Sequence, residues 1–482
     1  MDHFDLLIVG GGINGTAIAR DAAGRGQRVL LVEKDDLAAH TSASSSKLIH
    51  GGLRYLEYYE FRLVREALRE REILLRTAPH IVRPLRFVLP HGRGMRPWWM
   101  IRAGLKLYDL LAWGSSLPGS RLARDARLGS SLVEEKAERL ATYWDAWVDD
   151  ARLVVLNALD AAERGAEIAT RTEFLSARRK GDIWRAKLAG KRTVSAAAIV
   201  NAAGPWVASV LQKRLREESL SRVRLIKGSH IVVPRLFEGD HGYILQQPDG
   251  RVVFALPYDK ATLVGTTDIP VDEPEEAVIG EEEILYLCAA ANLYFERQTA
   301  PDDVIWSYSG VRSLFDDGAE DAKAVTRDYH LELDDEPGAK LLSVFGGKIT
   351  TARALAEEAL DRLGIGGDSI TRTAPLPGGD KSRDFDAYLE ELGSWMPAPL
   401  LSRLSRSYGT RLREMLSASS SEAALGWHFG AGLYEAEVRY LMAHEFARDV
   451  DDILWRRTKL GLHISAAGRE ALAVWMRSQG PS

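Results

Sequence analysis

The chain has 482 residues, which is more than one hydrophobic core usually serves, so we expect two or three domains. Its 46% hydrophobic and 27% charged residues are typical of a globular protein, and a formal charge of −5 gives no reason to expect nucleic acid as a partner. A single cysteine, Cys288, excludes an intramolecular disulfide, and no apolar run approaches the roughly 20 residues that span a bilayer, so we expect any membrane contact to be peripheral.

Residues 4–15, FDLLIVGGGING, predict a nucleotide site near the N-terminus. The apolar run before Gly10 indicates a buried parallel strand, and residues 13–23 indicate a helix. Gly10, Gly12 and Gly15 between them have the spacing G-x-G-x-x-G. At such a turn a dinucleotide pyrophosphate is held by the free N–H groups and partial positive charge of the helix N-terminus.

An acidic residue follows at the spacing that this motif requires. A second apolar strand, residues 28–32, ends at Glu33, about 20 residues after Gly15, where a carboxylate accepts a hydrogen bond from a ribose hydroxyl. Strand, glycines, helix, strand and acid in this order predict a bound dinucleotide, and they leave FAD and NAD as alternatives.

A segment rich in small and hydroxyl-bearing residues comes next. Residues 39–48, AHTSASSSKL, would be a solvated linker if they stood alone. They continue into residues 49–55, IHGGLRY, which mix apolar and functional side chains, and this favours a buried loop that follows an extended cofactor closely.

Residues 98–113 predict a helix that is apolar around most of its circumference. Trp98, Ile101, Leu105 and Tyr108 form one stripe, and a thin basic flank runs beside it. Such a helix suits either a hydrophobic core or a lipid interface, and the sequence leaves both alternatives open.

The pattern of strand, glycine turn and helix recurs twice later in the chain. One strand ends in residues 201–204, NAAG, and another meets residues 346–348, GGK, before a helix. We infer that the chain returns to the nucleotide sheet and that the nucleotide domain is discontinuous. Residues 222–268 are rich in strand signals and would form a wall over the cofactor, and residues beyond the linker 375–379 alternate with a helical period.

Several motifs together resemble the FAD-dependent glycerol-3-phosphate dehydrogenases of the aerobic, quinone-linked kind. They extend over nearly the whole chain: GGGINGTAIARDAAGRG, SSSKLIHGGLRYLE, YWDAWVDDARLV, NAAGPW, KGSHIVVP, GTTD, SGVR, VTRDY, VFGGKITTAR, YEAEVRYLMAHE and DDILWRRTKLGL. Two positions depart from the family pattern, because Ser313 stands where proline is usual and Phe315 where cysteine is frequent.

The resemblance implies FAD rather than NAD, and oxidation of sn-glycerol 3-phosphate to dihydroxyacetone phosphate, with electrons passed to ubiquinone or a similar membrane quinone. It also implies peripheral attachment to the cytoplasmic face of a bacterial inner membrane, for which the residues Trp98–Trp113 are available, and it allows for a homodimer. Two alternatives stay open: a related FAD-dependent oxidase that uses oxygen or acts on an amine or amino acid, and a non-catalytic flavin-binding scaffold.

The fold class expected is α/β. A Rossmann-type FAD-binding domain of the glycine- and D-amino-acid-oxidase group would be joined to a β-rich substrate domain and a C-terminal helical domain. We predict the FAD-binding domain from residues 1–60, 150–215 and 336–372, the substrate-binding and membrane-facing domain from 61–149 and 216–335, and the helical domain from 380–482.

The glycine motif and the resemblance together predict the residues around FAD. They are Gly10, Gly12, Ile13, Asn14, Gly15, Glu33, Lys34, Thr41, Ser42, Ser45, Ser46, Lys47, His50, Gly51, Gly52, Leu53, Ala203, Gly204, Trp206, Gly310, Gly347, Lys348, Ile349 and Thr350. No metal site is predicted.

A phosphate-bearing alcohol needs charge-assisted donors and a general base. The resemblance implies that the substrate is bound by Arg54, Tyr55, His230, Arg312, Arg327 and Lys348. Arg312 is also expected to take part in catalysis. Histidine titrates in the range that suits removal of the hydroxyl proton, and His230 is favoured over His50 because the strand KGSHIVV should face the substrate.

Overall fold

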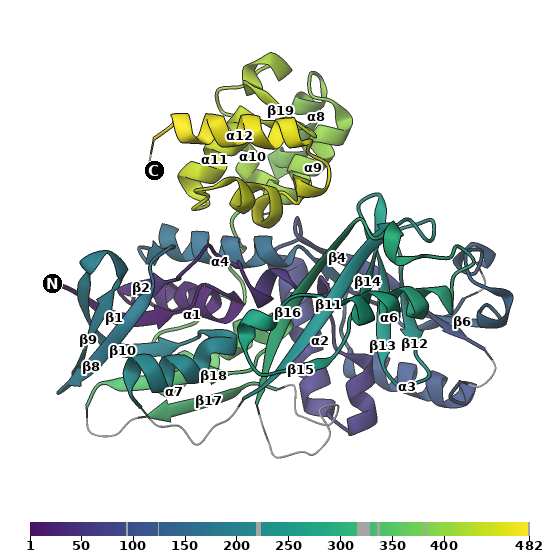
Figure 1. Ribbon diagram of the computed structural model, residues 1–482, viewed down its shortest axis with the longest axis horizontal. Coiled ribbons are helices and arrows are strands. Elements are labelled where there is room, and N and C mark those ends of the chain that lie inside the picture. The colour runs from purple at the N-terminus through teal and green to yellow at the C-terminus, as the bar shows by residue number, and fades with distance from the viewer. Residues whose placement is uncertain are drawn as a thin grey trace.

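The computed structural model describes residues 1–92, 95–123, 125–217, 223–315, 328–334, 338–380 and 383–480. Two large sheets stand side by side, and a C-terminal helical domain lies on top of them (Figure 1). No helix in these ranges is long and apolar enough to cross a membrane.

The first sheet has eight strands and contains the N-terminal strand. Its order is β17-β18-β10-β1-β2-β7; the strands from β18 to β7 are parallel, β17 is antiparallel, and the hairpin β8–β9 joins the edge of β10. The strands are β1 (Asp2–Val9), β2 (Val29–Val32), β7 (Glu167–Ala169), β8 (Phe174–Lys180), β9 (Ile183–Leu188), β10 (Thr193–Asn201), β17 (His330–Asp334) and β18 (Lys340–Phe345).

Alternate side chains of β1 point to opposite faces of this sheet, as the period of a strand requires. Leu6 and Ile8 pack under three helices, α1 (Ile13–Gly24), α4 (Asp150–Glu163) and α7 (Ala352–Leu363). Leu7 and Val9 face the β8–β9 hairpin and the short helix α5 (Val207–Ser209), which continues as a π-helix (Val210–Leu215). Both faces are therefore covered, which explains the continuous apolar sequence of the strand.

The second sheet has ten strands in the order β15-β11-β14-β13-β12-β4-β6-β3, with β16 paired to β11 and β5 to β6. The strands are β3 (Leu48–Ile49), β4 (Val82–His91), β5 (Arg121–Leu122), β6 (Arg139–Val148), β11 (Val223–Pro234), β12 (Gly242–Gln246), β13 (Val252–Tyr258), β14 (Ala261–Gly265), β15 (Ile269–Val271) and β16 (Trp306–Phe315). Its helices are α2 (Phe61–Thr77), α3 (Trp98–Leu111) and α6 (Glu281–Asn292).

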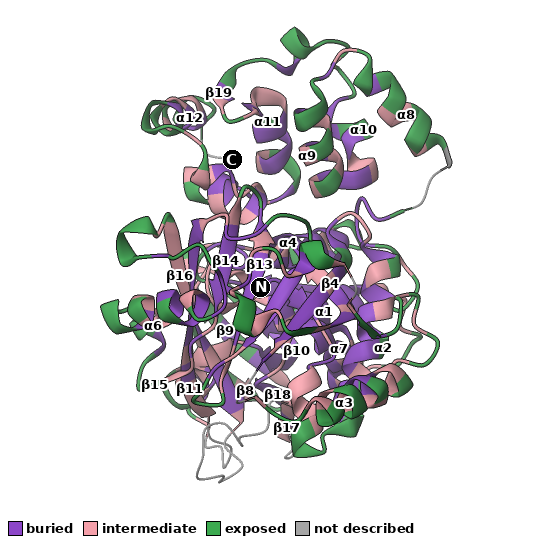
Figure 2. Cartoon of the chain, turned by 90° about the vertical axis from the view of Figure 1, so that its right-hand side faces the viewer, coloured by how far each residue is buried: buried purple, intermediate pink, exposed green. Residues whose placement is uncertain are grey.

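Helix α3 settles one of the open alternatives. It begins at Trp98, as predicted, but it buries only Leu105 and Tyr108, while Trp99 is 69% and Leu110 62% exposed. The interpretation as a core helix is therefore wrong. The helix lies on the outer surface, on the side of the molecule away from the C-terminal domain (Figures 1 and 2).

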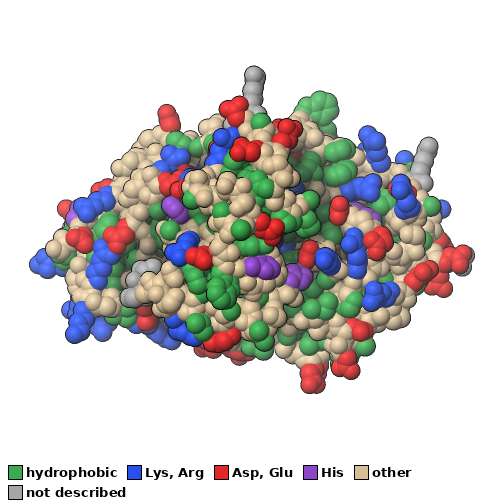
Figure 3. Space-filling view, turned by 90° about the horizontal axis from the view of Figure 1, so that it is seen from above, with side chains coloured by type: hydrophobic (Ala, Val, Ile, Leu, Met, Phe, Trp, Pro, Cys, Tyr) green, Lys and Arg blue, Asp and Glu red, His purple; other side chains and the backbone are tan. Residues whose placement is uncertain are grey.

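The C-terminal domain has a hydrophobic core of its own. It contains α8 (Arg383–Gly393), α9 (Ala398–Tyr408), α10 (Leu412–Met415), α11 (Glu435–His444), α12 (Ala466–Ser478) and a small hairpin, β19 (His428–Gly430) and β20 (Leu433–Tyr434). Seen from above, the side of the molecule on which this domain lies carries acidic and basic side chains mixed together (Figure 3).

Two strands differ in position from the predicted domain ranges. Strand β17 pairs with β18 in the first sheet, although its residues were assigned to the substrate domain. Strand β3 pairs with β6 in the second sheet, although its residues were assigned to the FAD-binding domain. The chain thus crosses between the sheets at both segments, and the exact domain boundaries stay a prediction.

Candidate functional site

A cavity of about 750 Å³ lies at the carboxyl ends of β1, β10 and β18. Its lining comes from the turns after these three parallel strands, from residues 38–50, and from strands β11 and β16 of the second sheet. This is the edge at which open α/β sheets bind ligands, and the volume lies within the range of ligand pockets.

The glycine turn forms one end of the cavity. Gly10, with φ of +114°, Gly12, Ile13 and Asn14 all line it, and α1 begins at Ile13. Gly15 does not line the cavity: a Cβ added there would lie 1.9 Å from the carbonyl oxygen of Gly10, so it is the residue that lets helix and strand pack closely. The start of α1 therefore lies at the cavity wall, and a helix N-terminus favours an anionic ligand.

Glu33 stands at the end of β2 and lines the cavity. Its Oε2 accepts a hydrogen bond from Gly11 N at 2.6 Å and its Oε1 accepts one from Asp35 N at 2.9 Å. These bonds fix the carboxylate beside the glycine turn, where the ribose is predicted.

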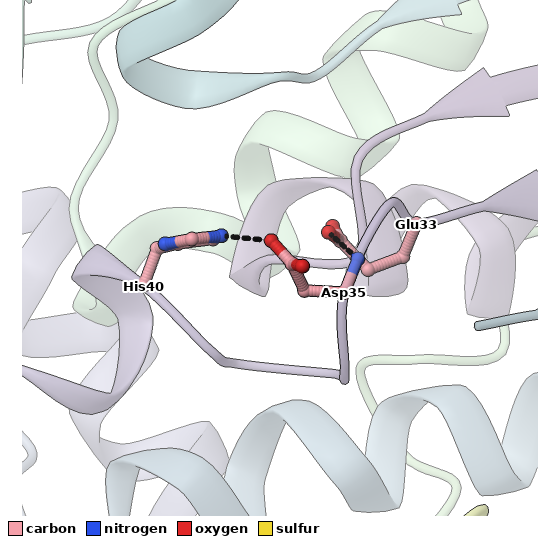
Figure 4. A group of neighbouring side chains, drawn as sticks. All are labelled: Glu33, Asp35 and His40. Carbon is pink, nitrogen blue, oxygen red and sulfur yellow. Dashed lines mark hydrogen bonds and ion pairs between the residues drawn. The ribbon is translucent and has the colours of Figure 1, made fainter. Parts of the chain in front are cut away.

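Glu33, Asp35 and His40 have ligand atoms within 4.8 Å of one another (Figure 4). His40 Nε2 is already bonded to Asp35 at 2.8 Å, and Glu33 accepts the two backbone N–H groups. Each of the three side chains thus already takes part in hydrogen bonds within the chain.

The serine-rich segment runs along the cavity as expected. Thr41, Ser42, Ser45 and Ser46 line it, together with Lys34 and His50. Ser42 Oγ accepts a hydrogen bond from Ile13 N at 3.0 Å, so the segment is bonded to the start of α1.

Lys47, predicted beside FAD, points away from the cavity. Its side chain is buried, and Nζ donates to Asp150 Oδ2 and to Ala43 O, both at 2.6 Å. Burial, followed by the charge of Lys459, lowers the pKa of Lys47 to about 8 against the opposing effect of Asp150. These contacts fix the conformation of the serine-rich loop and do not involve the cavity.

The two later returns to the sheet contribute as predicted to the lining. Ala203, Gly204 and Trp206 come from the turn after β10, and Gly347, Lys348, Ile349 and Thr350 from the turn after β18. Gly310 lines the cavity from β16, where a Cβ would lie 2.8 Å from that of Ser44.

His230 lines the cavity from strand β11. Its ring stacks on Tyr308 with centroids 4.8 Å apart, and Nε2 is 2.8 Å from Ser46 Oγ. Nδ1 is buried and has no hydrogen-bond partner among the described residues. Burial, followed by the charges of Lys47 and Arg312, lowers the pKa of His230 well below 6.5, so its imidazole is neutral.

Arg312 lines the cavity from strand β16, which pairs with β11. Its Nη1 pairs with Asp268 at 2.8 Å, and its Nη2 donates to Thr267 O at 3.0 Å. A Cβ at Gly228 would lie 2.1 Å from Nη2, so the absence of a side chain there makes room for the guanidinium.

Lys348 and Tyr55 meet across the cavity. Both line it, and Lys348 Nζ lies 3.9 Å from the centroid of the Tyr55 ring. His50, the other candidate base, also lines the cavity and contacts Phe254 edge to face at 6.2 Å.

Other predicted residues are not part of the cavity wall. Arg54 is half-buried on the 3-10 helix Leu53–Tyr58 and does not line the cavity. Gly51, Gly52 and Leu53 also lie behind the wall. Arg327 lies outside the described residues.

Sequence reasoning missed several lining residues. They include His40, Ser44, Glu173, Lys213, Arg214, Gly228, Thr266 and Glu275. Thr266 belongs to the GTTD motif, and its neighbour Gly265 pairs in register with His230, so the pairing of β11 with β14 brings that motif to the site. The motif itself was the available signal.

Comparisons with known proteins agree with this geometry. A family model described as FAD dependent oxidoreductase matches residues 5–362, and the model of the C-terminal domain of alpha-glycerophosphate oxidase matches residues 369–478. The chain is therefore an FAD-dependent oxidoreductase.

Three similar proteins extend this result. The chain is 51% identical to a glycerol-3-phosphate dehydrogenase of Pseudomonas aeruginosa, over 99% of this chain and 96% of the relative. It is 50% identical to a D-erythritol 1-phosphate dehydrogenase of Brucella abortus, over 98% of this chain and 97% of the relative. The crystal structure of a glycerol-3-phosphate dehydrogenase from Bacillus halodurans with FAD superimposes with a TM-score of 0.74 at 28% identity, over 99% of this chain and 90% of that one.

These matches confirm the predicted resemblance, the Rossmann-type FAD-binding fold and the C-terminal helical domain. They also resolve the nucleotide as FAD. The cavity of this FAD-dependent oxidoreductase fits that cofactor, because the glycine turn and the start of α1 line it at one end and the hydroxyl-bearing residues Thr41, Ser42, Ser45 and Ser46 line it along its length.

Proposed function

We propose that this FAD-dependent oxidoreductase oxidises sn-glycerol 3-phosphate to dihydroxyacetone phosphate and passes the electrons to a membrane quinone such as ubiquinone. The observation that carries the proposal is the pairing, in one cavity, of a neutral buried histidine with two cationic side chains, Arg312 and Lys348. The names of the two relatives with about half of their residues identical support a phosphorylated polyol as substrate.

FAD, when bound, supplies the flavin N5 that accepts a hydride from C2 of the substrate. Arg312 binds the phosphate, because a guanidinium forms parallel charge-assisted hydrogen bonds with such an anion, and Asp268 holds it in place. Lys348 adds a second positive charge beside the phosphate or the flavin, with its Nζ over the Tyr55 ring.

His230 is the proposed general base for the hydroxyl proton. Its Nε2 lies 2.8 Å from Ser46 Oγ, and its buried Nδ1 has no partner among the described residues. The lowered pKa keeps the imidazole of His230 neutral, so that it can accept the proton of the substrate hydroxyl. His50 remains the second candidate.

Anaerobic bleaching of the flavin tests the substrate directly. Adding sn-glycerol 3-phosphate to the oxidised protein without oxygen should remove the absorbance of oxidised flavin within the time of one catalytic turnover. Glycerol should leave this absorbance unchanged. Absence of bleaching at saturating substrate would refute the proposed activity.

D-erythritol 1-phosphate is a second candidate substrate, since the Brucella relative is as similar as the Pseudomonas one. The same bleaching assay compares sn-glycerol 3-phosphate with D-erythritol 1-phosphate. The compound that reduces the flavin with the larger rate constant, at equal subsaturating concentration, is the preferred substrate. An oxidase that uses oxygen would produce hydrogen peroxide in stoichiometric amounts under air, and one that acts on an amine would bleach with amino acids instead.

Helix α3 is the proposed contact with the membrane. Trp99, Met100, Leu110 and Trp113 are exposed apolar side chains on or next to it, and Arg102 and Lys106 are exposed beside them. Tryptophan and basic residues of this kind suit a lipid interface with anionic headgroups. We therefore propose peripheral attachment to the cytoplasmic face of the inner membrane; a homodimer stays a prediction.

Liposome binding tests the attachment. The triple variant Trp99→Ser, Leu110→Ser and Trp113→Ser should lose most of its binding to vesicles that contain anionic lipid. Trp427→Ser is the matched control, because Trp427 is 62% exposed on the C-terminal domain, away from α3. Equal binding of the triple variant and the control would show that α3 is not the membrane contact.

A further inference from the structure

One short segment of the C-terminal domain, Arg456 to Lys459, contacts both ends of the loop that lines the cavity. We call residues 33–47 the cofactor loop, because Glu33, Lys34, Thr41, Ser42, Ser45 and Ser46 line the cavity from it. Two carboxylates contact the segment 456–459. One is Asp36, within the cofactor loop, and the other is Asp150, at the start of α4. Helix α4 lies directly beneath the C-terminal domain (Figure 1).

The first contact is a buried ion pair at the beginning of the loop. Arg457 and Asp36 have exposed fractions of 0% and 3%. Both terminal nitrogens of Arg457 donate to the Asp36 carboxylate, with Nη2 2.8 Å from Oδ1, and Arg456 Nε donates to the same carboxylate. Two parallel donors fix both position and orientation of the carboxylate.

Arg457 is at the same time fixed within its own domain. Its Nε and Nη2 donate to the carbonyl oxygen of Glu445 at 3.1 Å and 2.7 Å. Arg456 in turn pairs with Asp452, whose side chain is buried. A displacement of Asp36 would thus have to break bonds on both domains.

The second contact lies at the other end of the loop. Lys459 Nζ is 3.7 Å from Asp150 Oδ1, and the other oxygen of Asp150 accepts hydrogen bonds from Lys47 Nζ at 2.6 Å and Ser45 Oγ at 2.8 Å. All three donors converge on a carboxylate that is fully buried. Asp150 therefore links the end of the cofactor loop to the C-terminal domain.

The cofactor loop carries groups that line the cavity, Glu33 just before the first contact and Ser42 and Ser46 after it. Glu33 is bonded to the glycine turn, Ser42 to the start of α1, and Ser46 to His230. A loop held at both ends keeps these groups in their binding positions, and a loop released at one end would open the cavity to solvent along its length.

We propose that the C-terminal domain acts as a clamp that retains FAD, with Arg457 and Lys459 as positioning residues that act through the cofactor loop. The inference depends on the assignment of FAD and on no particular substrate. It gives the C-terminal domain a role in cofactor retention, which none of its residues could perform by touching the cavity, since no residue beyond Thr350 lines it among those described.

The rate constant of FAD dissociation tests the clamp. The holoenzyme is diluted, and free FAD is followed by its fluorescence without substrate. Arg457→Met should release FAD at least ~10-fold faster than the unchanged protein, the scale of one lost charge-assisted hydrogen bond. Lys459→Met should release it a few times faster, because its ion pair is longer.

Arg403→Met is the matched control. Arg403 forms a comparable ion pair with Glu437, with bonds of 2.6 and 2.7 Å, but entirely within the C-terminal domain. It should lower the melting temperature of the apoprotein as Arg457→Met does, and leave FAD dissociation unchanged. Arg457→Lys, which retains a charge, should restore part of the retention.

Hydrogen exchange supplies a second readout. Amides of residues 33–47 should exchange faster in Arg457→Met and Lys459→Met than in Arg403→Met, with the amides of β1 unchanged. If Arg457→Met does not fold, FAD dissociation and hydrogen exchange measured on Lys459→Met alone test the clamp. Unchanged FAD dissociation in Lys459→Met and Arg457→Met, or equal acceleration in Arg403→Met, would overturn the clamp.

Discussion

The two ends of the cavity are built by different means. The nucleotide end is made largely of backbone: a glycine turn, a helix start and small residues that follow the cavity closely. The reaction end is made of long side chains, His230, Arg312 and Lys348, each held by a partner from another segment. A substitution at the nucleotide end should therefore weaken or abolish FAD binding. A substitution at the reaction end should instead lower the turnover number or the affinity for the substrate.

The largest effect is expected from Gly15→Val at the nucleotide end. Even a Cβ would lie 1.9 Å from the carbonyl oxygen of Gly10, so α1 must move away from β1 and the turn must deform. We expect the purified variant to contain essentially no FAD, measured from the ratio of flavin to protein absorbance. Gly104→Ala is the control, because its Cβ would meet open space; a flavin-loaded Gly15→Val protein would contradict the backbone account.

The second-largest effect is expected from His230→Asn at the reaction end. Loss of a general base should lower the turnover number by ~10²- to 10⁴-fold while FAD stays bound. The unchanged protein should keep its kcat/KM as the pH falls through 6.5 and lose it only at lower pH, because burial and the charges of Lys47 and Arg312 lower the pKa of His230 and keep the imidazole neutral.

His50→Asn separates the two histidines in the same assay. It should retain turnover within a few-fold and leave the acidic limb of the pH profile in place. Near-normal turnover of His230→Asn with an unchanged profile would eliminate His230 as the base and transfer that role to His50.

A smaller effect on affinity is expected from Arg312→Ala. Removal of a charge-assisted pair with the phosphate, about 3 kcal/mol, should raise the KM for sn-glycerol 3-phosphate by ~10²-fold. Arg54→Ala sharpens the test, since the resemblance implies a role for Arg54 in substrate binding but the side chain does not line the cavity. We expect a KM within a few-fold of normal for Arg54→Ala, and an unchanged KM in Arg312→Ala would refute the phosphate contact.

The two ends also differ in how far the sequence could predict them. Gly10, Gly12 and Glu33 could be placed from spacing alone, because a backbone turn and the residue that ends the next strand depend on local geometry. Arg312 was placed at the substrate by the family resemblance and not by spacing, since its partner Asp268 and the space left by Gly228 come from strands whose register the sequence does not contain.

Two further positions show the same limit. Lys47 belongs to a motif that predicted cofactor contact, yet its ammonium group pairs with Asp150, a buried residue far along the chain whose position the motif does not show. Helix α3 had an apolar circumference that suited burial, and only the fold shows that it lies at the surface. Local patterns identified these segments, and tertiary packing determined which way they face.

The smallest effect is expected from Ser46→Ala, which lies where the two ends of the cavity meet. Its hydroxyl orients the His230 ring through one hydrogen bond of 2.8 Å, and a single such bond contributes about 1 kcal/mol. We expect the rate of anaerobic flavin reduction to fall roughly 5-fold, with FAD still bound, since the cofactor loop keeps its contacts at Asp36 and Asp150. Loss of FAD instead would show that Ser46 belongs to the nucleotide end, and a normal rate would show that stacking on Tyr308 alone orients the ring.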